Sequence, residues 1–404
     1  MSKMKVKVVV GANYGDEGKG LATAYFSKIA RDNDEKCLNI LYNGSCQRGH
    51  TVELKDETRH VFHHFGSGTF YGADSYFDKD FIVNPIFFLE EKQKLMELGY
   101  NPIVYVNTDC RISIPFDAIL NQLFEEGRGA NKHGSCGFGV FETVKRNKNK
   151  DFAISFLDFA YLPYEDKYNF LKRIVNTYIP LRLEEMGYNK VPAQYFDILG
   201  GKFTDGLIKH YIEDFYSMES ICRVISTGKF LSSIYDVGIF EGGQGLLLDE
   251  HNMKNFPHLT PSTTTPVPPL KRISEENWKV EGKPEICYVT RTYLTRHGAG
   301  PMLNTCPKED ISKRIEDLTN VPNPHQDSLR YGHLDPYFID RITQSIGDVY
   351  EAWGGFYIDT SILFTHMNYT PIMNQTYLVI AAQAVDTIYR SNTKFAEDIE
   401  YGRY

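Results

Sequence analysis

Residues 5–20 read KVKVVVGANYGDEGKG, so that an apolar run passes directly into a loop with four glycines. The valine-rich run predicts a buried strand, and residues 19–31 after the loop predict a helix. A glycine-rich turn between a strand and a helix is a common phosphate cradle, because its backbone N–H groups point inward and its lysine adds positive charge. Asp16 and Glu17 place negative charge in the same loop, which raises the question of how a polyphosphate could bind there.

This loop differs from an ordinary Walker loop. The Walker pattern GxxxxGK[ST] has four residues between its glycines, whereas six separate Gly11 from Gly18 here, and Gly20 replaces the hydroxyl residue after the lysine. Mg²⁺ prefers oxygen ligands and could bridge carboxylates to phosphate, and a carboxylate beside a substrate could act as a general base. From this stretch alone, a glycine turn with solvated acids is the alternative.

The remainder of the chain alternates apolar runs with helical patterns, which is typical of α/β proteins. We predict a central, mostly parallel sheet flanked by helices, in one large domain over residues 1–404. Residues 151–232 carry aromatic and charged residues at helical spacing and predict a helical insertion. The polar tail after Arg390 is expected to be loosely held. Strands are expected within residues 37–43, 101–108, 237–249 and 285–296, a strand followed by a helix within 81–100, a helix over 116–127 and a last buried element over 377–385.

Bulk composition limits the classes of function. The chain has 404 residues, 42% of them hydrophobic, which is enough for a sizeable core. No run of about 18 apolar residues occurs, and MSKMKVKVVV passes straight into a strand without the apolar segment of a secretion signal. A net charge of −8 argues against a general nucleic-acid binder, and seven cysteines without a CxxC pair predict free thiols. We therefore expect a cytoplasmic protein whose partners are small molecules, not membranes or nucleic acids.

Three further stretches carry chemistry. GSCQRGHTV (44–52) places His50 after a predicted strand, at the sheet edge where ligands bind in open α/β sheets. IFEGGQGLLLDE (239–250) places Gln244 in a tight turn. A glutamine there can hydrogen-bond to the edge of a base, or it can have a purely structural role. The hydroxyls of TPSTTTP (260–266) suit a monoester phosphate, although such a stretch can also be a plain loop.

Together these stretches resemble the adenylosuccinate synthetase family, in the same order along the chain. GDEGKG is similar to its signature loop, NGSCQRGHTV to GGxNAGHTV, and FEGGQGLLLD with FPHLTPSTTTP to FEGAQGxxLDxxxGTYPxVTSSNTT. GANKHGSCGFGVFETVKR (129–146) is similar to RGAKxIGTTGRGIGPxYxDKxxR, TYLTRHGAGPM (292–302) to AYxTRVGxGPF, and SLRYGHLD (328–335), more weakly, to RRRxGWLD. The resemblance runs from about residue 5 to about residue 382 and implies a fold related to the P-loop NTPases.

The family joins aspartate to C6 of inosine monophosphate (IMP), driven by GTP and Mg²⁺. The resemblance implies that Asp16 is a magnesium ligand and also the base that removes the proton from purine N1. The 6-oxyanion then attacks the γ-phosphate, and O6 leaves as phosphate when the aspartate amine attacks C6. His50 would donate to the transferring phosphoryl group, Lys19 would neutralise its charge, and Gln244 would hold the 6-oxo edge.

The resemblance also implies sets of binding residues. Nucleoside triphosphate would be bound by Gly15, Glu17, Gly18, Lys19, Gly20, Gly49, His50, Thr51 and Asn368. The purine monophosphate would be bound by Asp16, Gln47, Ser135, Cys136, Arg146, Gln244 and Thr265, and the amino acid by Arg296 and Arg330. Mg²⁺ would be held by Asp16 and the carbonyl of Gly49. Arg146 would come from the partner subunit of a homodimer, which we expect for this reason.

Several departures from the family pattern bear on the substrates. The family's asparagine and alanine before GHT are Gln47 and Arg48, and its phosphate-binding threonine falls on Cys136. The arginine-rich loop is reduced to HQDSLRYG, which puts the amine substrate in question. The guanine-reading TKxD is THMN (365–368), and an asparagine amide suits adenine about as well as guanine. We therefore predict that the protein uses ATP, or accepts both ATP and GTP.

Four functions stay open from the sequence. The first is ligation of aspartate to IMP or dIMP, favoured because Asp16 would crowd a purine 2-amino group and is retained. The second is the same ligation on GMP or dGMP, as in phage relatives that often lack this aspartate. The third is a nucleotide-binding regulator without catalysis, suggested by the lost arginines. The fourth is an ordinary P-loop NTPase.

Overall fold

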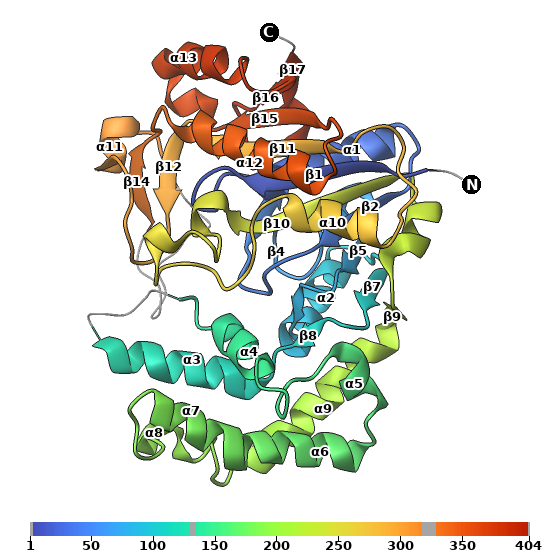
Figure 1. Cartoon of the computed structure of the whole chain (residues 1–404), viewed down its shortest axis with the longest axis vertical. Coiled ribbons are helices and arrows are strands. Elements are labelled where there is room, and N and C mark those ends of the chain that lie inside the picture. Colours follow the sequence, from blue (N-terminus) through green and yellow to red (C-terminus); the bar gives the residue numbers. More distant parts are fainter. Residues whose placement is uncertain (1–2, 130–134, 317–328, 403–404) are drawn as a thin grey trace.

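The computed structural model describes residues 3–129, 135–316 and 329–402, and it is organised around one ten-stranded sheet (Figure 1). The strand order is β17-β16-β15-β11-β1-β10-β2-β5-β7-β9. Neighbouring strands are parallel except β16 and β17. This confirms the predicted mostly parallel sheet. The strands are β1 Lys5–Gly11, β2 Cys37–Leu41, β5 Asp74–Phe77, β7 Val104–Asn107, β9 Cys222–Ile225, β10 Val237–Gly245, β11 Glu285–Arg291, β15 Asp359–Thr365, β16 Thr387–Arg390 and β17 Glu400–Gly402.

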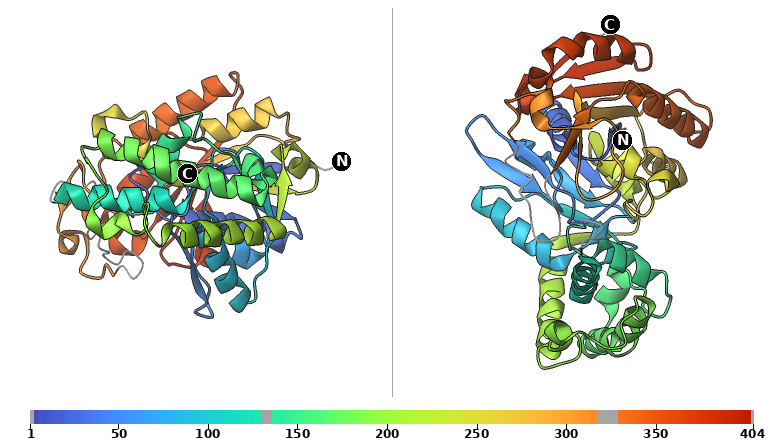
Figure 2. Two further views of the ribbon diagram at one scale, coloured as in Figure 1. Left: turned by 90° about the horizontal axis from the view of Figure 1, so that it is seen from below. Right: turned by 90° about the vertical axis from the view of Figure 1, so that its left-hand side faces the viewer.

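The centre of the sheet is buried on both faces, because β1 lies between β10 and β11 and helices cover each side. Val9 of β1 belongs to the apolar cluster that includes α1 (Lys19–Asp32). Val8 and Val10 point to the opposite face, into the cluster formed with α10 (Val267–Glu275) and α12 (Phe338–Ala352). Figure 2 shows α12 and α1 on opposite sides of the sheet. The valine run is therefore a strand buried on both sides.

A body of helices lies beyond one edge of the sheet, at the bottom of Figure 1. It differs from the predicted insertion at both ends, because it begins with α3 and because residues 222–225 return to the sheet as β9. β9 was not predicted from the sequence, because a four-residue edge strand that pairs with β7 on one side needs no extended apolar run. The helices are α3 Pro115–Arg128, α4 Val140–Asn147, α5 Phe156–Tyr161, α6 Tyr164–Arg173, α7 Ile179–Glu185, α8 Ala193–Phe196 and α9 Thr204–Ile221, with the π-helix η3 Ile174–Tyr178 between α6 and α7.

The tail after Arg390 is held in place, so the expectation of a loose tail is wrong. β17 pairs with β16, and the Tyr71 hydroxyl donates to Glu397 at 2.7 Å. A polar segment can be well ordered when it closes a sheet edge, because its backbone supplies the hydrogen bonds. The apolar residues from 377 onward fall in and after α13 (Pro371–Ala381). None of the helices within the described residues has the length and apolar character that a membrane span requires.

Smaller elements complete the surroundings of the phosphate loop. They include a two-stranded hairpin and a three-stranded antiparallel sheet, which follow the carboxyl ends of the central strands. The elements are β3 His50–Glu53, β4 Arg59–Phe62, β6 Ile82–Val83, α2 Pro85–Glu97, β8 Arg111–Ile112, β12 Tyr293–Arg296, β13 Thr305–Cys306, α11 Lys308–Ile311 and β14 Arg330–His333.

Candidate active site

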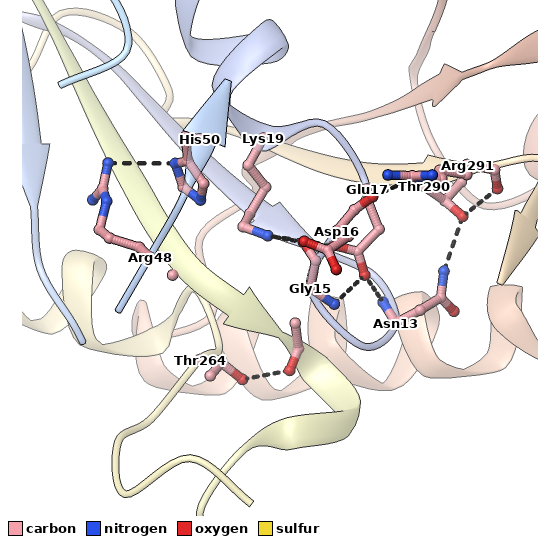
Figure 3. Close-up of polar contacts among 12 residues, drawn as sticks. Asn13, Gly15, Asp16, Glu17, Lys19, Arg48, His50, Thr264, Thr290 and Arg291 are labelled. Carbon is pink, nitrogen blue, oxygen red and sulfur yellow. Dashed lines mark hydrogen bonds and ion pairs between the residues drawn. The ribbon is translucent and has the colours of Figure 1, made fainter. Parts of the chain in front are cut away.

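The site lies at the carboxyl edge of the sheet, where the loops after five parallel strands meet (Figure 3). The loop after β1 supplies the phosphate loop. The loop after β2 leads to His50, and β10 carries Gln244 near its end. Strands β11 and β15 end with Arg291 and Thr365, which contact the same loop. Sequence reasoning on the parallel sheet predicted this meeting point.

Glu17 is turned into the phosphate loop and is only 3% exposed. Its Oε1 accepts the backbone N–H groups of Asn13 at 3.0 Å and Gly15 at 2.8 Å. A Cβ added to Gly11 would lie 2.4 Å from Glu17 Oε2, so the glycine makes room for this carboxylate. The Glu17 carboxylate therefore occupies the hollow formed by the loop's own N–H groups, and its contact with a triphosphate stays a prediction.

Lys19 begins α1 and is buried against the loop. Its Nζ donates to the carbonyl of Gly15 and lies 3.3 Å from Glu17 Oε2. The Thr365 hydroxyl donates to the Glu17 carbonyl at 2.7 Å and ties the loop to β15. A Cβ on Gly20 would lie 2.9 Å from His50 Cβ, so this glycine permits α1 and β3 to approach closely. The approach places Lys19 and His50 on one side of the loop (Figure 3).

Asp16 points away from the hollow and keeps 28% of its side chain exposed. Its Oδ2 lies 3.2 Å from His297 Nε2, and its backbone carbonyl accepts from Arg291 Nε. An accessible carboxylate of this kind fits Mg²⁺, which proteins usually hold through one or two carboxylates together with substrate phosphates. The described residues contain no group of three or more His, Cys, Asp or Glu side chains that could hold a metal by themselves. Asp16 and the Gly49 carbonyl stay the predicted donor set for a phosphate-bound Mg²⁺.

His50 is held by a buried carboxylate that the sequence reading did not single out. Its Nδ1 lies 2.5 Å from Glu241 Oε1, and Arg48 Nη2 lies 3.1 Å from Glu241 Oε2. Burial alone would raise the pKa of Glu241, but Arg48, His50 and Ser67 outweigh it and lower that pKa to about 2. Burial and the Arg48 charge lower the pKa of His50 to about 4, against the opposing effect of Glu241. At neutral pH the site therefore contains a carboxylate and a neutral imidazole.

Gln244 lies across from the phosphate loop. It adopts a left-handed backbone conformation with φ of 62°, and its Oε1 would be 3.5 Å from a Cβ at Gly15. This places its amide beside the loop that carries Asp16. A cavity of about 1090 Å³ opens on the other side of this turn, between α10 and α12, and its lining includes Tyr14 and Thr265.

The residues expected at the 5′-phosphate include Cys136 and Ser135. Cys136 is half-buried, and burial raises the pKa of its thiol to about 11. Ser135 Oγ donates to Asn121 Oδ1 of α3 at 3.1 Å. Residues 130–134 of the same motif lie outside the described residues.

Arg146 is directed into the helical body of its own chain, and its role at a phosphate of a partner subunit stays a prediction. It is completely buried, with Nη2 2.9 Å and Nε 3.0 Å from the carboxylate of Asp117. Its Nη1 and Nη2 also donate to the carbonyls of Phe152 and Ile112 at 2.8 and 2.9 Å. The guanidinium of Arg146 therefore makes its hydrogen bonds inside the helical body, because a buried arginine needs partners for its five N–H groups.

The two arginines predicted to bind the amino acid both donate to backbone carbonyls in this structure. Arg296 is buried, lies 4.8 Å over the ring of Tyr14, and donates to the carbonyls of His258 and Pro301. Arg330 donates to the carbonyls of Gly298 and Gly300 at 2.7 and 2.8 Å. Both guanidiniums therefore serve the backbone of the segment 298–301 in this structure. Residues 325–328 of the expected amino-acid loop lie outside the described residues.

The remaining predicted nucleotide-binding residues border the loop. Gly49 is exposed in the turn before β3, and Thr51 lies within β3. Asn368 lies in the short helix η7 (Met367–Tyr369) just after β15, and its carbonyl accepts from Arg314. The rings of His366 and Tyr369 stack beside it, with centroids 6.0 Å apart.

Sequence reasoning missed several residues of the site. One of them, Glu241, offered a signal, since a carboxylate inside the apolar strand VGIFEGG must find partners when it is buried. The others had no such signal, because their roles depend on loops brought together from distant parts of the chain. The missed residues are Arg48, Ser67, Glu241, Arg291, His297 and Thr365.

The fold and the site together define an α/β protein with an acidic phosphate loop and an adjacent histidine. A family model described as adenylosuccinate synthetase matches residues 8–344, and the chain belongs to this family of ligases. The adenylosuccinate synthetase of Bacillus subtilis is 28% identical over 328 residues, which are 78% of this chain and 68% of that protein. That of Borrelia turicatae is 24% identical over 310 residues, 74% of this chain and 64% of the relative. The match thus spans about two thirds of these relatives' length.

Two solved structures share the fold. Adenylosuccinate synthetase from Plasmodium falciparum, fully ligated, superposes with a TM-score of 0.65 at 17% identity, over 99% of this chain and 88% of that one. The cyanophage S-2L succinoaminodeoxyadenylate synthetase (PurZ), bound to dGMP and to dATP as an energy donor, gives a TM-score of 0.63 at 14% identity, over 99% and 95% of the chains. These likenesses confirm the predicted fold class.

Proposed function

We propose that this protein joins L-aspartate to C6 of a 6-oxopurine monophosphate, IMP or dIMP, through a 6-phosphoryl intermediate and at the expense of a nucleoside triphosphate. One observation carries the proposal: the two adjacent carboxylates of the loop face opposite ways. The Glu17 carboxylate is buried inside the loop, while Asp16 keeps 28% of its side chain exposed beside His297, next to Gly15, which Gln244 approaches. An accessible carboxylate at this point suits a base acting on a purine whose 6-oxo edge lies against Gln244.

The proposed reaction assigns each group a task. Asp16 removes the proton from purine N1, and the resulting O6 anion attacks the γ-phosphate, releasing the nucleoside diphosphate. Lys19 and His50 lie beside the loop, where they would contact the transferring phosphoryl group. The amine of aspartate then attacks C6, and the C6–O6 bond breaks with loss of phosphate. Mg²⁺, when bound by Asp16 and the Gly49 carbonyl, would neutralise charge on the phosphates.

The energy donor that we propose is ATP, with GTP as an accepted alternative. Asn368 presents an amide in place of a carboxylate, so it does not select the two N–H donors of guanine. The stacked His366 and Tyr369 beside it offer a flat surface to either purine. The nucleotide would thus be held by stacking and phosphate contacts more than by its base edge.

A second candidate is the same ligation on GMP or dGMP. The observation that favours it is the fold shared with the cyanophage enzyme bound to dGMP and dATP. Retention of an accessible Asp16 argues for the first candidate, because its carboxylate would lie near the 2-amino group of guanine.

A substrate matrix tests both candidates. Purified protein with Mg²⁺ receives IMP, dIMP, GMP or dGMP, each with ATP or GTP, with and without aspartate, and product is followed by mass and phosphate release. We expect aspartate-dependent product from IMP or dIMP with ATP. Product from dGMP or GMP alone would select the second candidate. Nucleotide binding without product from any mixture would overturn the proposal in favour of a regulator, and activity with GTP but not ATP would overturn the donor assignment.

A further inference from the structure

Glu241 is a buried carboxylate that accepts from four donor groups of three residues, which lie in two separate segments. Its Oε1 accepts from His50 Nδ1 at 2.5 Å and from the Ser67 hydroxyl. Its Oε2 accepts the Ser67 backbone N–H at 3.0 Å and lies 3.1 Å from Arg48 Nη2. The carboxylate has no exposed surface. Burying a charge of this kind costs free energy that only a complete set of partners offsets. The four hydrogen-bonding and ion-pair contacts are therefore needed to keep Glu241 charged inside the protein.

The carboxylate also stands on a rigid support. Glu241 lies in β10, in register with Val9 of β1 on one side and Leu41 of β2 on the other. His50 starts β3, directly under the first turn of α1, as its close approach to Gly20 shows. The hydrogen bond to Glu241 of the central sheet therefore fixes the imidazole of His50 beside the phosphate loop.

The contacts of His50 show which of its two ring nitrogens is hydrogen-bonded inside the protein. Nδ1 lies 2.5 Å from Glu241 and 3.3 Å from Arg48 Nη2. A carboxylate can only accept, so Nδ1 carries a proton that it donates to Glu241, and Arg48 serves as the ion-pair partner of the carboxylate. Nε2 is left for the side of the ring that faces Lys19, and Figure 3 shows His50 between Arg48 and Lys19. The tautomer follows from the hydrogen bond that Nδ1 makes.

We propose that Glu241, with Arg48 as its ion-pair partner, is the positioning residue of the reaction: it holds His50 by Nδ1–H so that Nε2 faces the transferring phosphoryl group, and it stabilises the imidazolium that forms when Nε2 takes up a proton from solvent beside the anionic phosphates and donates to them. Glu241 itself touches no reacting atom and acts through His50. This inference rests on the proposed function for its catalytic part, whereas the tautomer is a property of the protein alone.

Substitution Glu241→Gln separates positioning from a general structural role. The side chain keeps its shape, but Arg48 and the Ser67 N–H still require an oxygen on their side, so the amide nitrogen turns to His50. The hydrogen bond to Nδ1 then reverses, the neutral ring carries its single proton on Nε2, and the imidazolium loses the carboxylate that accepts from Nδ1. We expect turnover to fall about 100-fold, in the range of a mispositioned acid–base group, with nucleotide affinity changed less than about threefold.

A double-mutant cycle with His50→Asn supplies the decisive comparison. If Glu241 acts through His50, Glu241→Gln lowers turnover no further in the His50→Asn protein. Equal losses in both backgrounds would overturn the proposal. The matched control is Glu91→Gln, a buried carboxylate of α2 that accepts the N–H groups of His63 and His64 and does not touch His50. It should change turnover less than about threefold.

Nitrogen NMR of the wild-type protein labelled in its histidines tests the tautomer without catalysis. The His50 signal, assigned by its loss in His50→Asn, should show a protonated Nδ1 and an unprotonated Nε2, and Glu241→Gln should exchange the two. A proton on Nε2 in the wild type would overturn the positioning role. If the wild type made no product but showed the expected tautomer, the proposed function alone would fail.

Discussion

At the scale of the residue, Asp16 and Glu17 are neighbours with opposite tasks. Asp16→Ala should abolish product formation and leave the free energy of unfolding within about 0.5 kcal/mol, because its side chain is partly exposed. Glu17→Ala should lower the free energy of unfolding by about 1–3 kcal/mol, because two buried N–H groups and Lys19 lose their acceptor. Product assays and urea unfolding of both variants check this. Substantial turnover in Asp16→Ala would remove Asp16 from the chemistry.

His64 gives the protein a residue-level response to acid. Burial lowers the pKa of His64 to about 3, with smaller repulsion from His63 and Arg48, although Glu91 opposes the shift. The unfolded chain binds this proton below about pH 6.5. Between the folded pKa of about 3 and the unfolded pKa of about 6.5, unfolding therefore takes up one proton on His64. The contribution of neutral His64 to stability is complete above about pH 6.5 and is lost as the pH falls toward 3.

The substitution His64→Gln should remove this response. A glutamine can still accept the Asn84 N–H that now donates to His64 Nε2 at 3.1 Å, but it does not titrate. We expect the free energy of unfolding to fall less steeply with acid, by up to about 1.4 kcal/mol per pH unit. Urea unfolding at pH 6, 5 and 4 measures the slope, with His210→Gln on the exposed surface of α9 as control. An unchanged slope would show that His64 titrates normally.

At the scale of the element, Arg146 joins parts of the helical body. From α4 it reaches Asp117 of α3, the carbonyl of Ile112 in β8 and the carbonyl of Phe152. We expect Arg146→Ala to lower the free energy of unfolding by about 3–5 kcal/mol, because Asp117 is left as a buried, unpaired charge.

The neighbouring Lys145 provides the matched control for Arg146. Lys145 pairs with Glu185 at the surface, where both side chains are at least 38% exposed. Its replacement by alanine should cost less than about 1 kcal/mol. A stable Arg146→Ala protein with weakened binding of purine monophosphate would instead restore the phosphate-binding role that the sequence suggested.

At the scale of the whole molecule, the sequence predicted those elements that carry a local signal. The valine run of β1, the helix after Lys19 and the turn at Gln244 are set by apolar periodicity and glycine spacing, and the structure has all three. Five strands of the sheet were not predicted, namely β5, β9, β15, β16 and β17. For the two edge strands, β9 and β17, the reason is that a short edge strand is selected by the partner that it meets, not by its own composition.

The sequence by itself determined the α/β class, the phosphate loop and the meeting of loops at one sheet edge, since parallel strands bring all their carboxyl ends together. Only the tertiary structure decided the direction in which each charged group faces. Glu17, Arg146, Arg296 and Arg330 turned inward to backbone or buried partners, and Glu241 proved to hold His50. The physical reason is that a buried charge must be paired, and its partner can come from any segment that packs against it.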